Sequence, residues 1–189
     1  MTKKELRKLY KEKRNHLSLK ESLRLDDLLL IQFQHCSLGD IQTLLSYWPI
    51  NDKVEVNTHL MVDYLSFRIP GLRVAFPVMD ISEHGLKPFV IDENTDYRQN
   101  DYGIAEPMNG EEIAATEIDA AFVPLLVCDK KGYRVGYGKG FYDRFLATCR
   151  EDILKIGFSH FEPVELIKDI NEFDVPLSIC ITPNKIYEF

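Results

Sequence analysis

An apolar run at residues 120–127 leads directly into a segment rich in glycine and cations, which then takes up helical spacing. Because strands buried on both faces of a parallel sheet are continuously apolar, the run predicts a strand. The segment at 128–146, CDKKGYRVGYGKGFYDRFL, alternates glycines with cations before an aromatic pair and a lone carboxylate. A strand, a glycine-rich basic turn and a helix start together allow backbone N–H groups and cations to surround a phosphate.

Helical and strand patterns alternate along the rest of the chain. Ser18 and Glu21 form a capping-box pattern, and Asn57 or Thr58 is placed to cap a later helix. We predict helices at 3–16, 18–36, 58–67, 140–149 and 163–170, strands at 41–47, 72–78, 120–127, 153–158 and 178–182, and a hairpin at 86–91. This alternation predicts a single domain over residues 1–189 with an α/β fold, a three-layer α/β/α sandwich of Rossmann-like type with a mostly parallel central sheet.

The predicted sheet also places the ligand site. In open α/β sheets, ligands bind beyond the carboxyl ends of the strands. The glycine loop directly follows a predicted strand, and the turns after Tyr47 and Val78 fall on the same edge. We therefore expect the loop, Glu55 and the segment 100–107 to surround one crevice.

The charge balance argues against a general nucleic-acid binder but is compatible with a local anion site. The chain has 23 Lys and Arg against 30 Asp and Glu, a net charge of −7. Cations crowd the first predicted helix, where Lys3, Arg7 and Arg14 fall within about 40° of one another around the helix axis. Without other information a solvated basic face is the better interpretation of these cations. The balance indicates a small anionic ligand.

The remaining composition predicts a cytoplasmic protein. No apolar run approaches the roughly 20 residues of a membrane helix. The N-terminal cations are not followed by the apolar stretch of a secretory signal. The four cysteines are scattered without a CxxC pair, which indicates free thiols in a reducing compartment. We expect a monomer without membrane or nucleic-acid partners.

The glycine loop carries the best candidates for chemistry. Arg134 and Lys139 can supply positive charge to β- and γ-phosphates, and Asp143 can hold Mg²⁺ through oxygen. The loop matches neither the Walker pattern nor the dinucleotide fingerprint. The competing interpretation is a flexible loop with solvated charges. The adjacent Phe141 and Tyr142 argue against it, because a flexible loop has little need of packed aromatic residues.

Other candidates are weaker when each is taken alone. Glu55 can accept hydrogen bonds from a heterocycle, although a lone carboxylate is more often a surface or cap residue. Asp174 is a candidate second metal carboxylate, but turn residues of this kind are commoner. Tyr102 can stack on a flat ring, although most such tyrosines are simply half-buried. The five histidines show no metal-ligand spacing, and the sequence gives no basis for a Ser/His/Asp or Cys/His arrangement.

Taken together, these segments resemble the 5-formyltetrahydrofolate cyclo-ligase family, also called 5,10-methenyltetrahydrofolate synthetases. The family pattern has KxxxR near the N-terminus, then E-[VI]-[DE]-T, x-G-I-x-E-P, a G-x-R-x-G-x-G-x-G-[YF]-Y-D loop and a late D-x-P. This chain carries the corresponding segments in the same order: KKELR at 3–7, EVNT at 55–58, YGIAEP at 102–107, GYRVGYGKGFYD at 132–143 and DVP at 174–176.

The resemblance implies a role for each matching residue. It implies that ATP contacts the first helix and the loop through Lys3, Lys4, Arg7, Arg134, Gly136, Tyr137, Gly138, Lys139, Gly140, Phe141 and Tyr142. It implies that the folate contacts Glu55, Tyr102, Tyr137, Gly138, Lys139, Gly140 and Phe141. Arg134 and Lys139 are expected to be catalytic. Asp143, with Asp174 as a helper, is expected to hold Mg²⁺.

The resemblance also implies the activity of an ATP- and Mg²⁺-dependent ligase of one-carbon metabolism. The γ-phosphoryl group of ATP would pass to the formyl oxygen of 5-formyltetrahydrofolate, giving an N5-iminium phosphate. Attack by N10 and departure of phosphate would then give 5,10-methenyltetrahydrofolate, with ADP and phosphate released. Two alternatives stay open. One is a non-catalytic folate- or nucleotide-binding protein, and the other is a sugar-phosphate isomerase-like enzyme that uses a carboxylate base.

Four positions depart from the family pattern. Tyr137 stands where many members have Arg, which removes a phosphate-side cation or shifts its duty to Lys139. Phe141 stands where many members have Tyr, which removes a hydroxyl. Asn57 and Ser178 replace residues that are commonly acidic.

Overall fold

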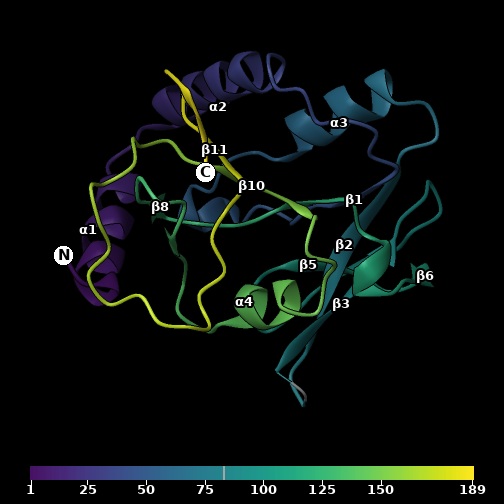
Figure 1. Ribbon diagram of the computed structural model, residues 1–189. Helices are drawn as coiled ribbons and strands as arrows, with labels where there is room; N and C mark the ends of the chain where they lie inside the picture. Colours follow the sequence, from purple (N-terminus) through teal and green to yellow (C-terminus); the bar gives the residue numbers. More distant parts are fainter. Residues whose placement is uncertain (83) are drawn as a thin grey trace.

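The computed structural model describes residues 1–82 and 84–189. In this part of the chain, eight strands form one central sheet in the order β12-β11-β10-β7-β1-β2-β3-β6 (Figure 1). Their bounds are β1 Thr43–Leu45, β2 Arg73–Asp80, β3 Gly85–Val90, β6 Glu111–Glu112, β7 Ala120–Phe122, β10 Leu154–Phe158, β11 Ile179–Ile181 and β12 Ile186–Glu188. Two smaller ladders join β4 Tyr97–Gln99 to β5 Ala105–Pro107, and β8 Val127–Cys128 to β9 Arg134–Val135.

The inner strands of the central sheet run parallel. β11, β10, β7, β1 and β2 pair in parallel, with Leu44 of β1 opposite Val74 on one side and Ala120 on the other. β12, β3 and β6 add antiparallel pairs at the two edges. The prediction of an α/β fold with a mostly parallel sheet is therefore confirmed.

Helices cover both faces of this sheet. Figure 1 shows α2 (Leu19–Phe33) and α3 (His59–Arg68) on one side and α4 (Phe141–Leu146) on the other. α1 (Lys3–Asn15) packs through its apolar stripe on the β8–β9 ladder. Short 3-10 turns lie at η1 (Asn51–Lys53) and η2 (Ala115–Glu117). Within the described residues, no helix combines the length and the apolar character needed to cross a membrane.

Capping explains where the first helices begin. Thr2 and Ser18 each form a capping box with the glutamate three residues later. Thr58 occupies the N-cap position of α3, as predicted. Its hydroxyl instead donates to the carbonyl of Tyr47 at 2.8 Å. This bond ties the start of α3 to the residues that follow β1.

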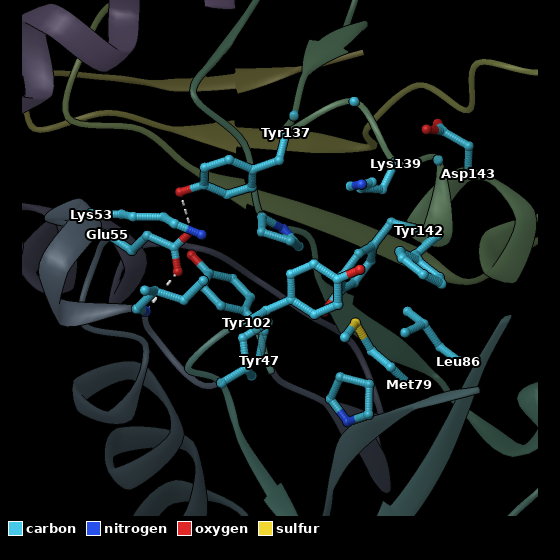
Figure 2. Close-up of a pocket in the computed structure, with 18 of the residues that line it drawn as sticks. Tyr47, Lys53, Glu55, Met79, Leu86, Tyr102, Tyr137, Lys139, Tyr142 and Asp143 are labelled. Atoms are coloured by element: carbon cyan, nitrogen blue, oxygen red, sulfur yellow. Dashed lines mark hydrogen bonds between the residues drawn. The ribbon is translucent and has the colours of Figure 1, made fainter. Parts of the chain in front are cut away.

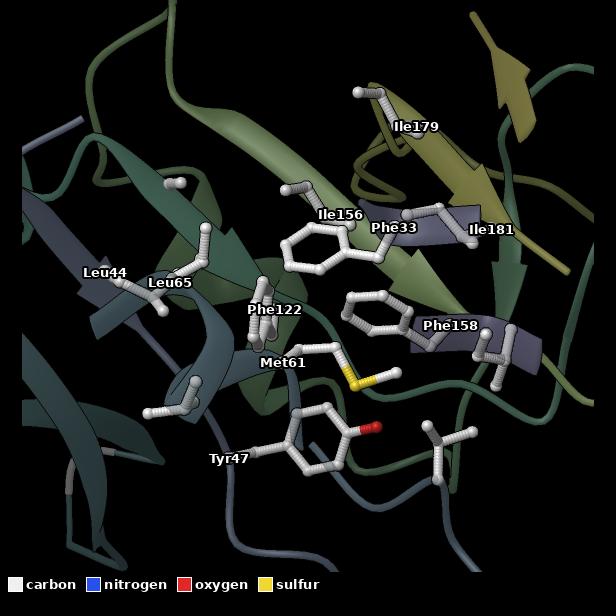
Figure 3. Packing of buried hydrophobic residues seen from close by; sticks show 14 of the residues in the cluster. Phe33, Leu44, Tyr47, Met61, Leu65, Phe122, Ile156, Phe158, Ile179 and Ile181 are labelled. Atoms are coloured by element: carbon white, nitrogen blue, oxygen red, sulfur yellow. The ribbon is translucent and has the colours of Figure 1, made fainter. Parts of the chain in front are cut away.

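Strand alternation divides the core between the two faces. Leu44 and Phe122 belong to the cluster under α2 and α3, whereas their neighbours Leu45 and Ala121 belong to the cluster under α4. On the first face, Phe33 of α2 meets Phe122 edge-on with ring centroids 5.8 Å apart (Figure 3). This packing fixes α2 on β7, the strand that precedes the glycine loop.

The predicted strand at 120–127 is wrong in its second half. β7 ends at Phe122, and the Val123 N–H still donates to the Ile156 carbonyl at 2.8 Å. Pro124 follows and has no N–H with which to continue the ladder. The chain leaves the sheet there, and Leu126 N–H donates to the carbonyl of Val135 at 2.7 Å.

The predicted helix at 163–170 is also wrong, because these residues take up no helix. The Val164 N–H donates to the Cys128 carbonyl at 2.9 Å, and the Lys130 N–H donates to the Val164 carbonyl at 3.0 Å. Asp129 Oδ2 accepts the Ile167 N–H at 3.1 Å. Long-range partners therefore replace helical hydrogen bonds. The helix expected at 140–149 is shorter, Phe141–Leu146, and β12 was not predicted.

Candidate active site

A cavity of about 530 Å³ lies where the N-terminal helix, the segments following β1 and β2, and the glycine loop come together (Figure 2). Most of the residues predicted for the site line it: Lys3, Arg7, Glu55, Tyr102, Arg134, Gly136, Tyr137, Gly138, Lys139, Gly140, Phe141, Tyr142, Asp143 and Asp174. Lys4 does not line the cavity, and its side chain is exposed. Segments far apart in the sequence thus share one cavity, as the sequence predicted.

Helix α1 and the glycine loop make direct contact at one end of the cavity. Arg7 Nε donates to the carbonyl of Gly136 at 2.9 Å. Gly138 has a φ of 93°, and a Cβ atom at this position would lie 3.0 Å from Arg7 Cζ. Glycine is required there both for the left-handed backbone and for the close approach of the guanidinium. Gly140 is also left-handed, with a φ of 71°, and forms the N-cap of α4.

Arg134 is a buried cation next to a carboxylate. Its side chain is only 5% exposed, and Nη2 donates to Asp143 Oδ1 at 3.0 Å. Nη1 donates to the carbonyl of Val175 at 2.5 Å. Burial lowers the pKa of the Arg134 guanidinium, and the nearby Asp143 opposes that shift. Two hydrogen-bond partners, one of them charged, therefore hold the cation in one orientation at the cavity wall.

Two carboxylates at this end are candidates to hold a metal ion. Asp143 Oδ1 accepts hydrogen bonds from Arg134 and from the Val175 N–H, whereas Oδ2 accepts none within residues 1–82 and 84–189. Asp174 forms an ion pair with Lys3. In the same part of the chain, no three His, Cys, Asp or Glu side chains cluster as a metal site. Mg²⁺ commonly uses one or two carboxylates plus phosphate oxygens, so these residues fit that ion when phosphates are bound.

The opposite side of the cavity is aromatic and includes the carboxylate of Glu55 (Figure 2). Glu55 Oε1 accepts a hydrogen bond from the Tyr137 hydroxyl, and Oε2 accepts the Ile50 N–H at 2.8 Å. Burial raises the pKa of Tyr142 well above its usual range. Its buried hydroxyl has no hydrogen-bond partner within the described residues. Tyr142 therefore lines the cavity although its hydroxyl is shielded from solvent.

Several lining residues were not predicted as site residues. They include Lys11, Tyr47, Trp48, Lys53, Met79, Leu86 and Glu106. The sequence could have indicated four of them. Three follow the strand β1 at the edge where ligands bind, namely Tyr47, Trp48 and Lys53, and Glu106 belongs to the GIAEP segment. Glu106 Oε1 accepts the N–H of Met79 at 2.9 Å and anchors the β2–β3 hairpin. Met79 and Leu86 reach the cavity through that hairpin. The sequence predicted a hairpin within 86–91, but these residues form one strand, β3, whose partner is β2.

The lining suits group transfer between bound ligands. Cations, glycine backbone and Asp143 form one end, and Glu55 with aromatic rings forms the other. Among the described residues that line the cavity there is no Cys, His, Ser or Thr. The described lining therefore offers no side-chain nucleophile of those four types. The cations and the glycine backbone can position charged ligands and neutralise their charge.

Known proteins are similar to this chain over most of its length. The model of the 5-formyltetrahydrofolate cyclo-ligase family matches residues 1–183. A 5-formyltetrahydrofolate cyclo-ligase of Mycoplasma pneumoniae is 29% identical over 188 residues, covering 96% of this chain and 98% of that protein. One of Mycoplasma genitalium is 40% identical over 73 residues, covering 38% of this chain and less than half, 44%, of that protein.

A solved structure has the same fold over the full chain. The structure of Aquifex aeolicus 5,10-methenyltetrahydrofolate synthetase superposes with a TM-score of 0.79 and 26% sequence identity. The match covers 100% of this chain and 93% of that one. The cavity lies in the part that the two share.

Proposed function

The chain belongs to the 5-formyltetrahydrofolate cyclo-ligase family, and from this premise we propose that it converts 5-formyltetrahydrofolate to 5,10-methenyltetrahydrofolate with ATP and Mg²⁺. ADP and phosphate are the other products. The observation that carries the proposal is that Arg7 of α1 and Arg134 of the glycine loop line the same cavity as Glu55.

The cationic end is assigned to ATP. Lys3, Arg7, Arg134 and Lys139 are directed there by α1 and by the loop, and the backbone from 136 to 140 approaches closely at its glycines. Fixed cations in a partly desolvated cavity stabilise charge that develops on a transferring phosphoryl group. Arg134 suits this role because its hydrogen bonds to Asp143 and Val175 already fix its orientation.

Mg²⁺ is assigned to Asp143, with Asp174 as its helper. When bound there, the ion would neutralise charge on the β- and γ-phosphates. Asp143 keeps Oδ2 available while Oδ1 holds Arg134, so one carboxylate serves both cations. Asp174 pairs with Lys3 in the absence of ligand, and it would exchange this partner when phosphates arrive.

The aromatic end is assigned to the reduced pterin. Glu55 can accept hydrogen bonds from pterin N–H groups, and Tyr102, Phe141 and Tyr142 provide rings around a flat ligand. Lys139 Nζ lies 5.9 Å from the centre of the Tyr102 ring, at the junction of the two ends. This position supports a role for Lys139 beside the formyl oxygen and the γ-phosphate, where it would neutralise negative charge.

The proposed reaction needs no covalent bond to the protein. The formyl oxygen attacks the γ-phosphorus and ADP leaves, which gives an N5-iminium phosphate. N10 then attacks the activated carbon and releases its proton to solvent, and phosphate departs with the former formyl oxygen. Arg134 and Lys139 neutralise the phosphoryl oxygens in both steps, and the cavity wall holds N10 near the carbon.

The test is a turnover assay. Purified protein is mixed with 5-formyltetrahydrofolate, ATP and MgCl₂, and the near-ultraviolet absorbance of the methenyl product and the released phosphate are followed together. We expect the two signals to rise in equal amounts and to need all three reagents. Ligand binding without product would favour a non-catalytic binding protein. Isomerisation of a sugar phosphate without nucleotide would favour the isomerase-like alternative.

A further inference from the structure

Arg14 is a buried cation that the proposed catalytic residues do not explain. Its residue exposure is 2%, although it belongs to the basic helix α1. Nη2 donates to the Leu125 carbonyl at 2.6 Å, and Nη1 donates to the Tyr137 hydroxyl at 3.2 Å. Nε is buried without a partner in the described part of the chain. Burying a guanidinium away from water costs free energy of desolvation, which its hydrogen bonds must offset.

Arg14, Tyr137 and Glu55 are linked by two hydrogen bonds, and Arg14 determines which group donates in each of them. A guanidinium only donates, so the Tyr137 oxygen must accept from Arg14. The Tyr137 proton is then directed to Glu55 Oε1, as Figure 2 shows. Glu55 Oε2 accepts the Ile50 N–H from the opposite side. Glu55 is therefore held at both oxygens, and Arg14 controls one of the two bonds without touching the carboxylate.

We propose that Arg14 is a positioning residue that acts through Tyr137 to hold Glu55 in the orientation that accepts the pterin N–H groups. This inference rests on the function proposed above. The resemblance already implies that Tyr137 contacts the folate, and the inference adds that its hydroxyl holds Glu55 in place. Tyr137 lines the cavity, whereas Arg14 lies behind it and reaches the ligand only through the tyrosine.

The charges around this chain of groups support the assignment. Lys53 Nζ lies 4.7 Å and Lys11 Nζ lies 5.5 Å from the centre of the Tyr137 ring, and both lysines line the cavity beside it. Burial and the charge of Glu55 raise the pKa of Tyr137 well above its usual range. The hydroxyl therefore stays protonated and continues to donate to Glu55. Its orientation depends on Arg14.

The experiment is a double-mutant cycle between Arg14→Lys and Tyr137→Phe. Lysine keeps the charge but lacks the planar guanidinium, whose two terminal nitrogens donate to the Leu125 carbonyl and the Tyr137 hydroxyl at the same time. Phenylalanine keeps the ring and removes the bridging hydroxyl. We expect each single variant to raise KM for 5-formyltetrahydrofolate about tenfold, as for a lost hydrogen bond to a charged group. KM for ATP should change less than twofold, and the double variant should be no worse than either single one.

A binding measurement separates this inference from the proposed function. Trp48 is the one tryptophan in the sequence and lines the cavity, so its fluorescence reports 5-formyltetrahydrofolate binding without ATP. If the unmodified protein neither binds nor turns over this folate, the proposed function fails. If it does both, but the variants bind as tightly as the unmodified protein, only the present inference fails. Tighter binding by Tyr137→Phe would also overturn it, because Tyr137 would then compete with the pterin.

Matched controls and a second cycle protect the test against effects on folding. Tyr64→Phe and Arg24→Lys make the same chemical changes at residues that do not line the cavity, and both should leave KM unchanged. If Arg14→Lys does not fold, Tyr137→Phe is combined with Glu55→Gln instead. We expect the loss from Tyr137→Phe to disappear in that background. Additive losses in either cycle contradict the proposal.

Discussion

Two buried arginines of the cavity region have different partners, and the difference separates their roles. Arg134 reaches a carboxylate, Asp143, and lines the cavity. Arg14 reaches only a carbonyl and a hydroxyl among the described residues and does not line the cavity. At the scale of single residues, we therefore expect substitution of Arg134 to affect the chemical step and substitution of Arg14 to affect folate binding.

Arg134→Ala should lower kcat on the order of 10²–10³-fold, because it removes a fixed cation from the transferring phosphoryl group. The measurement is steady-state turnover at saturating ATP and folate, with circular dichroism to establish that the variant is folded. Arg150→Ala is the control, since Arg150 is 40% exposed and pairs with Asp119 and Asp152 outside the cavity. A kcat within threefold of the unmodified protein would remove Arg134 from the mechanism.

At the scale of elements, the N-terminal helix is attached to the rest of the site at its first residue. Lys3 pairs with Asp174, and its backbone N–H donates to Asp169 Oδ1 at 2.6 Å. Both side chains of the Lys3–Asp174 pair are 17% exposed, so the pair is accessible to an arriving phosphate. α1 therefore lies in position before ATP binds, and Lys3 has only to change partner.

Lys3→Ala should raise KM for ATP about tenfold, the usual cost of losing a hydrogen bond between charged groups. The kcat should change little, since Arg134 is untouched. KM for ATP is measured at saturating folate, and Lys8→Ala on the exposed face of α1 serves as the control. A lower melting temperature with an unchanged KM would show that Lys3 only attaches the helix.

The sequence predicted the elements whose signals are local. The capping box at Ser18 marks a helix that begins where the structure has it, at Leu19. The wrong predictions, the second half of the strand at 120–127 and the helix at 163–170, lie where the backbone conformation is not set by the local pattern of apolar residues. Pro124 ends β7 early, and the Asp129 carboxylate captures the Ile167 N–H that a helix at 163–170 would have used.

The same distinction holds for the site. The glycine loop could be recognised because its glycines, cations and carboxylate are contiguous in the sequence. The helical spacing placed Arg14 beside Lys3 and Arg7, but it could not show that Arg14 is buried. Its partner Tyr137 lies 123 residues away and meets it only after α1 packs on the β8–β9 ladder.

At the scale of the whole molecule, the cavity and the surface differ in charge. The chain carries a net charge of −7, yet cations outnumber carboxylates among the described residues that line the cavity. A positive cavity in a negative protein attracts small anions and disfavours nucleic acid. Folding produces this difference, because α1, η1 and the glycine loop each bring cations to the same place.

The same fold couples stability to pH through His59, the first residue of α3. Its ring lies 4.7 Å from the Trp48 ring, centre to centre, and burial lowers its pKa below the usual 6.5, with Asp63 opposing the shift. A depressed pKa means that the unfolded chain binds the proton more tightly. The stabilisation is therefore complete above about pH 6.5 and is lost as the pH falls through the pKa of the folded state.

His59→Gln should remove this part of the pH dependence. The free energy of unfolding in urea is measured at about pH 7.5 and about pH 5, on either side of the usual histidine pKa. We expect the unmodified protein to lose more stability between the two conditions than the variant does. His35→Gln, at an exposed site, should behave as the unmodified protein. Equal losses in His59→Gln and the unmodified protein would mean that Trp48 and its neighbours pack equally well around a charged imidazole.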